Sequence, residues 1–167
     1  MAERDSIFSS KTTYNGFFSF SDFYNFCYNW LTEEMGLFVT EKKYSEKIMG
    51  DAKIIEIKWE GLKEITDYFQ MEVKVDFRIN NLTKVEINQG GVKIQTNKGS
   101  VEMKIAGVLV KDYKGKFETS ATRKFLRGVY EKWVIPSRID EFQGRIVKEC
   151  DEFLSQAKAY LDLEGKR

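Results

Sequence analysis

Three adjacent acid pairs are the residues whose type and spacing could support acid–base chemistry: Glu33-Glu34, Asp140-Glu141 and Asp151-Glu152. Neighbouring side chains on a helix diverge by about 100°, so each pair favours a solvated face over a paired-carboxylate site. The 167 residues include no histidine. Serine and cysteine triads therefore lack their usual base, and zinc sites lack their usual nitrogen ligand. Only carboxylate, tyrosine or lysine chemistry remains, and the sequence favours a protein that is not an enzyme.

Glycines and cysteines give no cofactor signature. Gly90-Gly91 lacks the lysine and the spacing of a phosphate-binding loop and is typical of a hairpin turn, so no cofactor is expected. Cys27 and Cys150 both fall on apolar helix faces, which predicts two small buried hydrophobic side chains. A disulfide or a metal pair is the alternative.

One segment carries a local basic excess, opposed only by Glu131. Its cations are Arg123, Lys124, Arg127, Lys132 and Arg138, and Tyr130 and Trp133 lie among them. Arg123, Arg127 and Lys132 are candidates for contact with a phosphate, a lipid head group or an acidic partner. The alternative is the solvated side of an amphipathic helix whose rings belong to the core. Lysine plus arginine number 27 against 26 acids, so net charge gives no reason to expect nucleic acid.

Large aromatic side chains form the other candidate site. Aromatic residues make up 14% of the chain, which suggests either a wide core or a lined pocket. The rings that could line an apolar chamber are Phe23, Phe26, Trp30, Trp59, Phe69, Phe77, Tyr130 and Trp133. They could equally fill a large core at normal density.

Alternating apolar and polar residues from Leu37 to Asp112 predict an antiparallel meander that needs a helical cover on its apolar face. We expect α+β architecture in the order β-α-β6-α-α: about seven strands that grip a long C-terminal helix. Residues 1–10 are predicted to be loose, and 11–165 to form a single domain. The expected strands are 11–20, 37–48, 53–60, 69–79, one near Val85, 92–96 and 101–110. The expected helices are 21–36, 120–134 and 137–161, and Pro136 separates the last two.

Turn chemistry and strand phase refine this scheme. Ser21 is predicted to cap the first helix, and Gly36 to end it in a left-handed conformation. Residues 61–64 are predicted to form a turn. Apolar positions shift phase at Ala106-Gly107, which predicts a bulge that bends the last strand.

Strand 11–20, the first helix, the meander and the segment Asp112 to Gly165 with its terminal helix together resemble the helix-grip fold of the START and Bet v 1-like superfamily, also called the SRPBCC or polyketide cyclase-like group. In that family the strands curl round the terminal helix, and many members hold lipids, sterols or other apolar molecules in between. The resemblance rests on element order across most of the chain. Helix 120–134 is an addition to the family pattern and could plug a cavity or dock a partner.

Two functions follow as hypotheses. The first is non-enzymatic binding of an apolar small molecule or lipid between the sheet and the C-terminal helix. The alternative is a protein–protein interaction module with a filled core, which docks through helix 120–134 or the C-terminal helix. The longest apolar stretch, Ile105 to Val110, is too short to span a membrane, and no leader opens the chain, so we expect a cytoplasmic protein.

Overall fold

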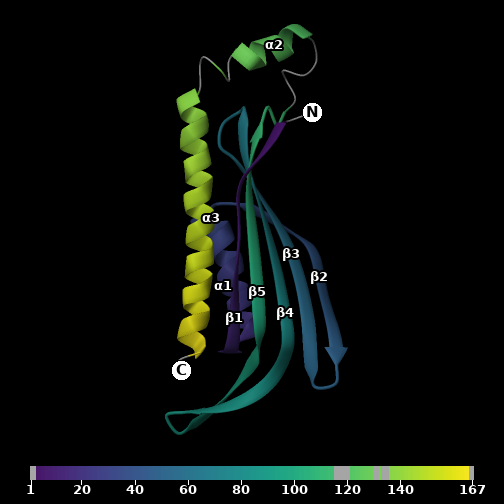
Figure 1. Ribbon diagram of the computed structural model, residues 1–167. Coiled ribbons are helices and arrows are strands. Elements are labelled where there is room, and N and C mark those ends of the chain that lie inside the picture. Colours follow the sequence, from purple (N-terminus) through teal and green to yellow (C-terminus); the bar gives the residue numbers. More distant parts are fainter. Residues whose placement is uncertain (1–2, 115–120, 130–131, 133–135, 166–167) are drawn as a thin grey trace.

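The fold is a two-layer α+β structure in which one antiparallel sheet carries a helical layer on one face. The computed structural model describes residues 3–114, 121–129, 132 and 136–165 (Figure 1). The strands are β1 (Glu3–Phe18), β2 (Phe38–Met49), β3 (Ala52–Glu64), β4 (Phe69–Gln89) and β5 (Val92–Lys111). The helices are α1 (Phe20–Asn29), which continues as a π-helical turn (Trp30–Glu34), α2 (Ala121–Val129) and α3 (Pro136–Gly165).

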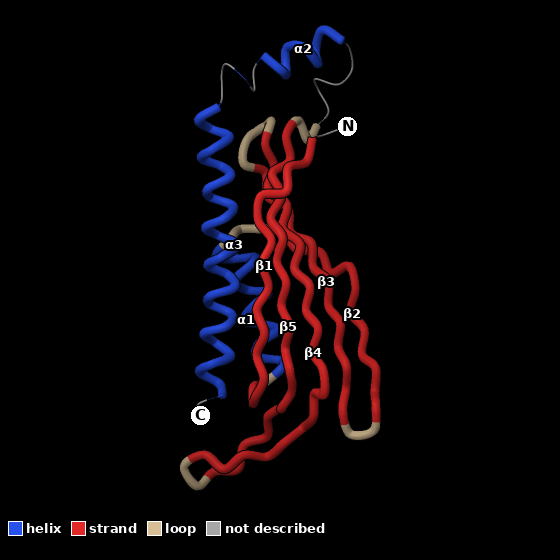
Figure 2. Tube along the Cα trace, in the orientation of Figure 1, coloured by secondary structure: helices blue, strands red, loops and turns tan. Residues whose placement is uncertain are grey.

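The described sheet has five strands in the order β1-β5-β4-β3-β2 (Figure 2), so the predicted count of about seven is wrong. The expected strands leave breaks after Ile79 and at residues 97–100, but both segments lie inside strands, in β4 and β5. Asn81 adopts a φ of +55°, and the register shifts between Asn80 and Thr83, but pairing continues to Gln89 and Val92. The four strands expected between residues 69 and 110 are therefore the two arms of one long hairpin with its tip at Gly90-Gly91, and its outer part bends away from the line of the sheet (Figure 1).

The N-terminal segment is the second correction, because β1 begins at Glu3 and residues 3–10 are not loose. Glu3 pairs with Lys111 in the register, and the Lys111 ammonium lies 3.7 Å from Glu3 and 3.0 Å from Asp5. Backbone pairing with β5 gives these polar residues a place at the edge of the sheet. Their composition alone had suggested a solvated coil.

Three predicted local features, a bulge, a turn and a helix cap, lie elsewhere or are absent in the structure. The predicted bulge lies in β1, where the register shifts between Ser6 and Phe8 opposite Gly107; β5 itself pairs with β4 without a break there. Strand β3 runs through the predicted turn at 61–64 and ends at Glu64. Helix α1 is capped by Ser19 rather than Ser21, and its cap makes no side-chain hydrogen bond. The left-handed Gly36 is confirmed, with a φ of +69°.

The core lies between the sheet and a layer formed by α1 and α3. Helix α3 runs along β1 and β5 and buries a stripe of Phe142, Ile146, Cys150, Phe153, Leu154, Ala157 and Leu161. Cys27 and Cys150 are buried free thiols, as the structural interpretation predicted. Burial raises the pKa of Cys27 well above its usual range and that of Cys150 to about 12, so both thiols stay uncharged at neutral pH.

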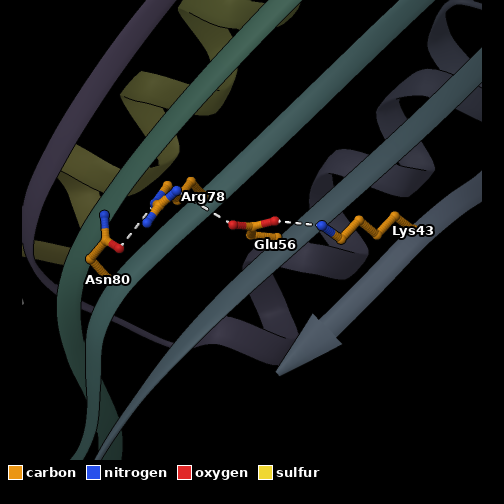
Figure 3. A network of polar contacts seen from close by, with 4 residues as sticks. All are labelled: Lys43, Glu56, Arg78 and Asn80. Carbon is orange, nitrogen blue, oxygen red and sulfur yellow. Dashed lines mark hydrogen bonds and ion pairs between the residues drawn. The ribbon is translucent and has the colours of Figure 1, made fainter. Parts of the chain in front are cut away.

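Charged residues of both signs cover the outer face of the sheet. Glu56 accepts hydrogen bonds from Lys43, at 2.7 Å, and from Arg78, at 3.4 Å, and Arg78 also donates to Asn80 (Figure 3). These contacts lower the pKa of Glu56, chiefly through the hydrogen bond and charge of Lys43. A shallow groove on this face is lined by three cations and three anions, Lys58, Arg78, Lys104, Glu56, Asp76 and Glu102. Balanced charges of this kind are typical of a solvated surface.

Glu72 is the exception on that face, because it is a charged residue that is only 3% exposed. Arg4 donates a hydrogen bond to it, and the Lys74 ammonium lies 4.0 Å away. We expect Arg4→Met to lower the free energy of unfolding by about 1–3 kcal/mol, because it removes a donor from a buried carboxylate. Urea unfolding checks this.

The matched control for that prediction is the double variant Arg4→Met/Glu72→Met, which removes both charges together. It should recover most of the lost stability, because an apolar pair leaves no buried charge without its partner. A double variant as unstable as Arg4→Met would show that Arg4 acts through packing alone.

Candidate functional site

The predicted ring set divides into three groups in the structure. Trp59 and Phe77 lie 5.0 Å apart, and Phe77 contacts Phe23 at 5.9 Å. Phe26 stacks on Tyr160 at 4.5 Å and lies beside Trp30. Phe69 instead contacts Phe142, 5.2 Å away, where α3 begins. Tyr130 and Trp133 lie outside the described residues.

The first group of rings, which the first hypothesis offered as lining of a ligand chamber, lies between α1 and the sheet. Phe23, Trp59 and Phe77 are all buried. The void among them is also bordered by Phe20, Tyr24, Ile57 and Ile79, and it is too narrow to hold a water molecule. At this position the side chains therefore pack as a core, and a drug-sized ligand site needs about 300 Å³ or more.

The basic candidates lie on or beside α2, which extends beyond the end of the sheet (Figure 1). Arg123, in α2, and Lys132, beyond its end, are exposed. Arg127 also lies in α2, but the structure does not describe its side chain. Three apolar side chains of α2 are also exposed, at 69% for Phe125, 50% for Leu126 and 36% for Val129. The alternative that placed the rings of this helix in the core is therefore wrong for Phe125.

A second concave surface, which sequence reasoning missed, lies where α1 faces the edge strand β2. We name it the tyrosine groove; it measures about 360 Å³ and is lined by Phe20, Ser21, Tyr24, Asn25, Glu41 and Tyr44. The Tyr24 ring lies 6.1 Å from Phe20 and 6.3 Å from Tyr44, with interplanar angles of 51° and 82°. The three rings therefore form a partly open aromatic corner.

Carboxylates fix the tyrosine hydroxyls of this groove. Tyr24 donates to Glu41 at 2.5 Å, the Trp59 indole donates to the same oxygen at 2.9 Å, and Tyr44 donates to Glu46 at 2.8 Å. Burial and the hydrogen bond to Glu41 raise the pKa of Tyr24 to about 12, and burial and Glu46 likewise raise that of Tyr44. Both phenols are therefore neutral at physiological pH and act as hydrogen-bond donors with intact π faces.

Two further open grooves adjoin the same end of α1. The larger measures about 550 Å³, and its charged lining is balanced between Glu46 and Asp51 on one side and Lys53 and Lys84 on the other. The tyrosine groove differs because Glu41 is the only charged residue among those that line it. It could recognise a positively charged group, but it holds no arrangement of base and nucleophile for a reaction.

No group of three or more potential metal ligands lies close enough to hold an ion within the described ranges. None of the helices described here combines the length and the apolar character that a bilayer-spanning segment needs. No family model, no curated protein and no solved structure matches the chain.

Proposed function

We propose that this protein is a non-enzymatic interaction module with a filled core, which docks α2 on an acidic, partly apolar surface of another protein. The observation that carries this proposal is the exposure of Phe125, Leu126 and Val129 on a helix that also bears Arg123, Lys124 and Arg127. Helical spacing puts the apolar and the basic residues on opposite sides. An uncovered amphipathic helix gains stability when a partner removes its apolar side from water.

The earlier hypothesis of an apolar ligand between the sheet and α3 has less support. Three of the rings proposed to line that chamber, Phe23, Trp59 and Phe77, contact one another between α1 and the sheet, and the void that they border there does not admit water. The START-like resemblance remains a proposal about architecture, supported by the antiparallel sheet and the long terminal helix. The resemblance by itself does not assign a ligand.

The proposal predicts that Phe125→Asp will abolish a complex that the wild-type chain forms in the cells that produce it. A tagged chain would be recovered with its partner, and the mass of the reconstituted complex measured by light scattering. We expect a loss of affinity of at least tenfold, because a buried aromatic anchor commonly contributes about 2 kcal/mol or more to binding. Reversal of Arg123, Arg127 and Lys132 to Glu should weaken the same complex and slow its association.

The matched control is Val92→Asp, which changes an equally exposed apolar residue on the β4–β5 hairpin, 62% exposed. This variant should keep the complex. Equal loss in both variants would indicate a general defect and would contradict docking through α2. Binding of the purified chain to anionic vesicles, abolished by Phe125→Asp, would assign the helix to a membrane surface and overturn the protein-docking proposal.

A further inference from the structure

The tyrosine groove owes its composition to a bulge in β2. Glu41 pairs with Trp59 and Lys43 with Lys58, so the register shifts at Lys42. Tyr44 then pairs with Ile57. In a regular strand, residues 41 and 44 would point to opposite faces of the sheet. The extra residue puts both on the inner face, as their pairing with the buried Trp59 and Ile57 indicates.

Electrostatics of the groove favour a cation. Glu41 accepts hydrogen bonds from two uncharged donors, the Tyr24 hydroxyl and the Trp59 indole. Within the part of the chain that the structure describes, no lysine or arginine forms an ion pair with this carboxylate, whereas the neighbouring Glu46 is paired with Lys53 at 3.5 Å. A carboxylate that forms no ion pair with any described lysine or arginine therefore lies beside three aromatic rings.

We propose that the tyrosine groove binds a methylated ammonium group. Aromatic faces attract such cations through their quadrupoles, and a quaternary nitrogen needs no hydrogen-bond donor or acceptor from the protein. Phe20, Tyr24 and Tyr44 supply the faces, and Glu41 supplies the charge. The inference is independent of docking through α2, because the two surfaces share no residue.

The test is a titration of the purified full chain with choline chloride, followed by the NMR signal of the Trp59 indole N–H. This proton reports locally because it is bonded to Glu41. We expect saturable binding in the millimolar range, since cation–π contacts at partly exposed sites are weak. Sodium chloride at equal ionic strength and the neutral isostere of choline, in which carbon replaces nitrogen, should produce no saturable shift.

A short peptide with one trimethyl-lysine provides a second arm. Tighter binding of the peptide than of choline would identify the source of the cation as a modified protein, and the reverse order would identify a small molecule. Both outcomes support the site. Absence of saturable binding by both probes, or equal binding of the neutral isostere, overturns the proposal.

Variants separate the rings from the charge. Tyr44→Leu should weaken choline binding about tenfold, while Tyr44→Phe keeps the ring and should bind nearly as well as the wild type. Glu41→Gln retains an oxygen that accepts from Tyr24 and Trp59 but loses the charge, so it should also weaken binding several-fold. Tyr28→Leu is the matched control, because Tyr28 contacts Trp59 from the next turn of α1 but does not line the groove. Unchanged affinity in Tyr44→Leu would contradict recognition by the rings.

Discussion

Replacement of Phe23 by alanine is expected to lower the free energy of unfolding by about 3–5 kcal/mol, the usual cost of removing a large buried ring. The Phe23 ring is 2% exposed and contacts rings from three other elements, Phe18 of β1, Phe77 of β4 and Tyr160 of α3. Removal leaves a cavity at the point where both layers meet. Urea unfolding with an unchanged m-value would measure the loss.

The matched variant is Phe38→Ala, which removes the same ring where it is 74% exposed on the edge strand. Its effect should stay within about 0.5 kcal/mol. The comparison also distinguishes a filled core from a ligand chamber. A loss below about 1 kcal/mol in Phe23→Ala, together with uptake of a lipophilic probe by the wild type, would favour the chamber.

Hydrophobic periodicity predicted the parts of the fold in which burial decides the conformation. In the expected helix 137–161, the apolar stripe from Phe142 to Leu161 is buried, and in the expected strand 69–79, alternate residues from Phe69 to Ile79 are buried. Both patterns repeat often enough that only one face of each element can be apolar. The helical cover on the sheet follows from the same reasoning.

Predictions failed where a local signal competed with long-range pairing. Asn80-Asn81 is a strong turn signal, but pairing of β4 with β5 on both sides of it keeps the strand continuous. Glu3 to Ser10 is polar enough to suggest a coil, yet its backbone pairs with β5 as an antiparallel strand. In both cases the partner is β5, which the sequence of the segment itself does not reveal.

The candidate site was predictable only in part. The ring set was identified correctly as a cluster of interior side chains for Phe23, Trp59 and Phe77, but composition cannot reveal the volume left between them. The tyrosine groove was missed because the bulge at Lys42 decides which face of the sheet Glu41 and Tyr44 lie on. This bulge falls within a run of polar residues, where apolar–polar alternation gives no information.

Because α3 lies close to the sheet, Gly107 has less room for a side chain than the other glycine of β5, Gly99. A Cβ atom at this residue would lie 2.6 Å from Cγ2 of Ile146 and 3.0 Å from Sγ of Cys150. Alanine normally stabilises a strand relative to glycine, because glycine loses more conformational entropy on folding. Here we expect the opposite sign: Gly107→Ala should cost about 1–3 kcal/mol, and Gly107→Val about 3 kcal/mol or more, as α3 is forced away from β5.

Gly144 provides the matched comparison, because it lies in α3 with no atom within 4 Å of an added Cβ. Gly144→Ala should therefore stabilise the protein by about 0.5–1 kcal/mol through helix propensity alone. A double-mutant cycle locates the clash: Gly107→Ala combined with Ile146→Ala should cost less than the sum of the single changes, by about 0.5–3 kcal/mol. Strict additivity, or stabilisation by Gly107→Ala, would mean that α3 does not rest on this glycine, and the two-layer arrangement of sheet and terminal helix would then need another contact to hold it.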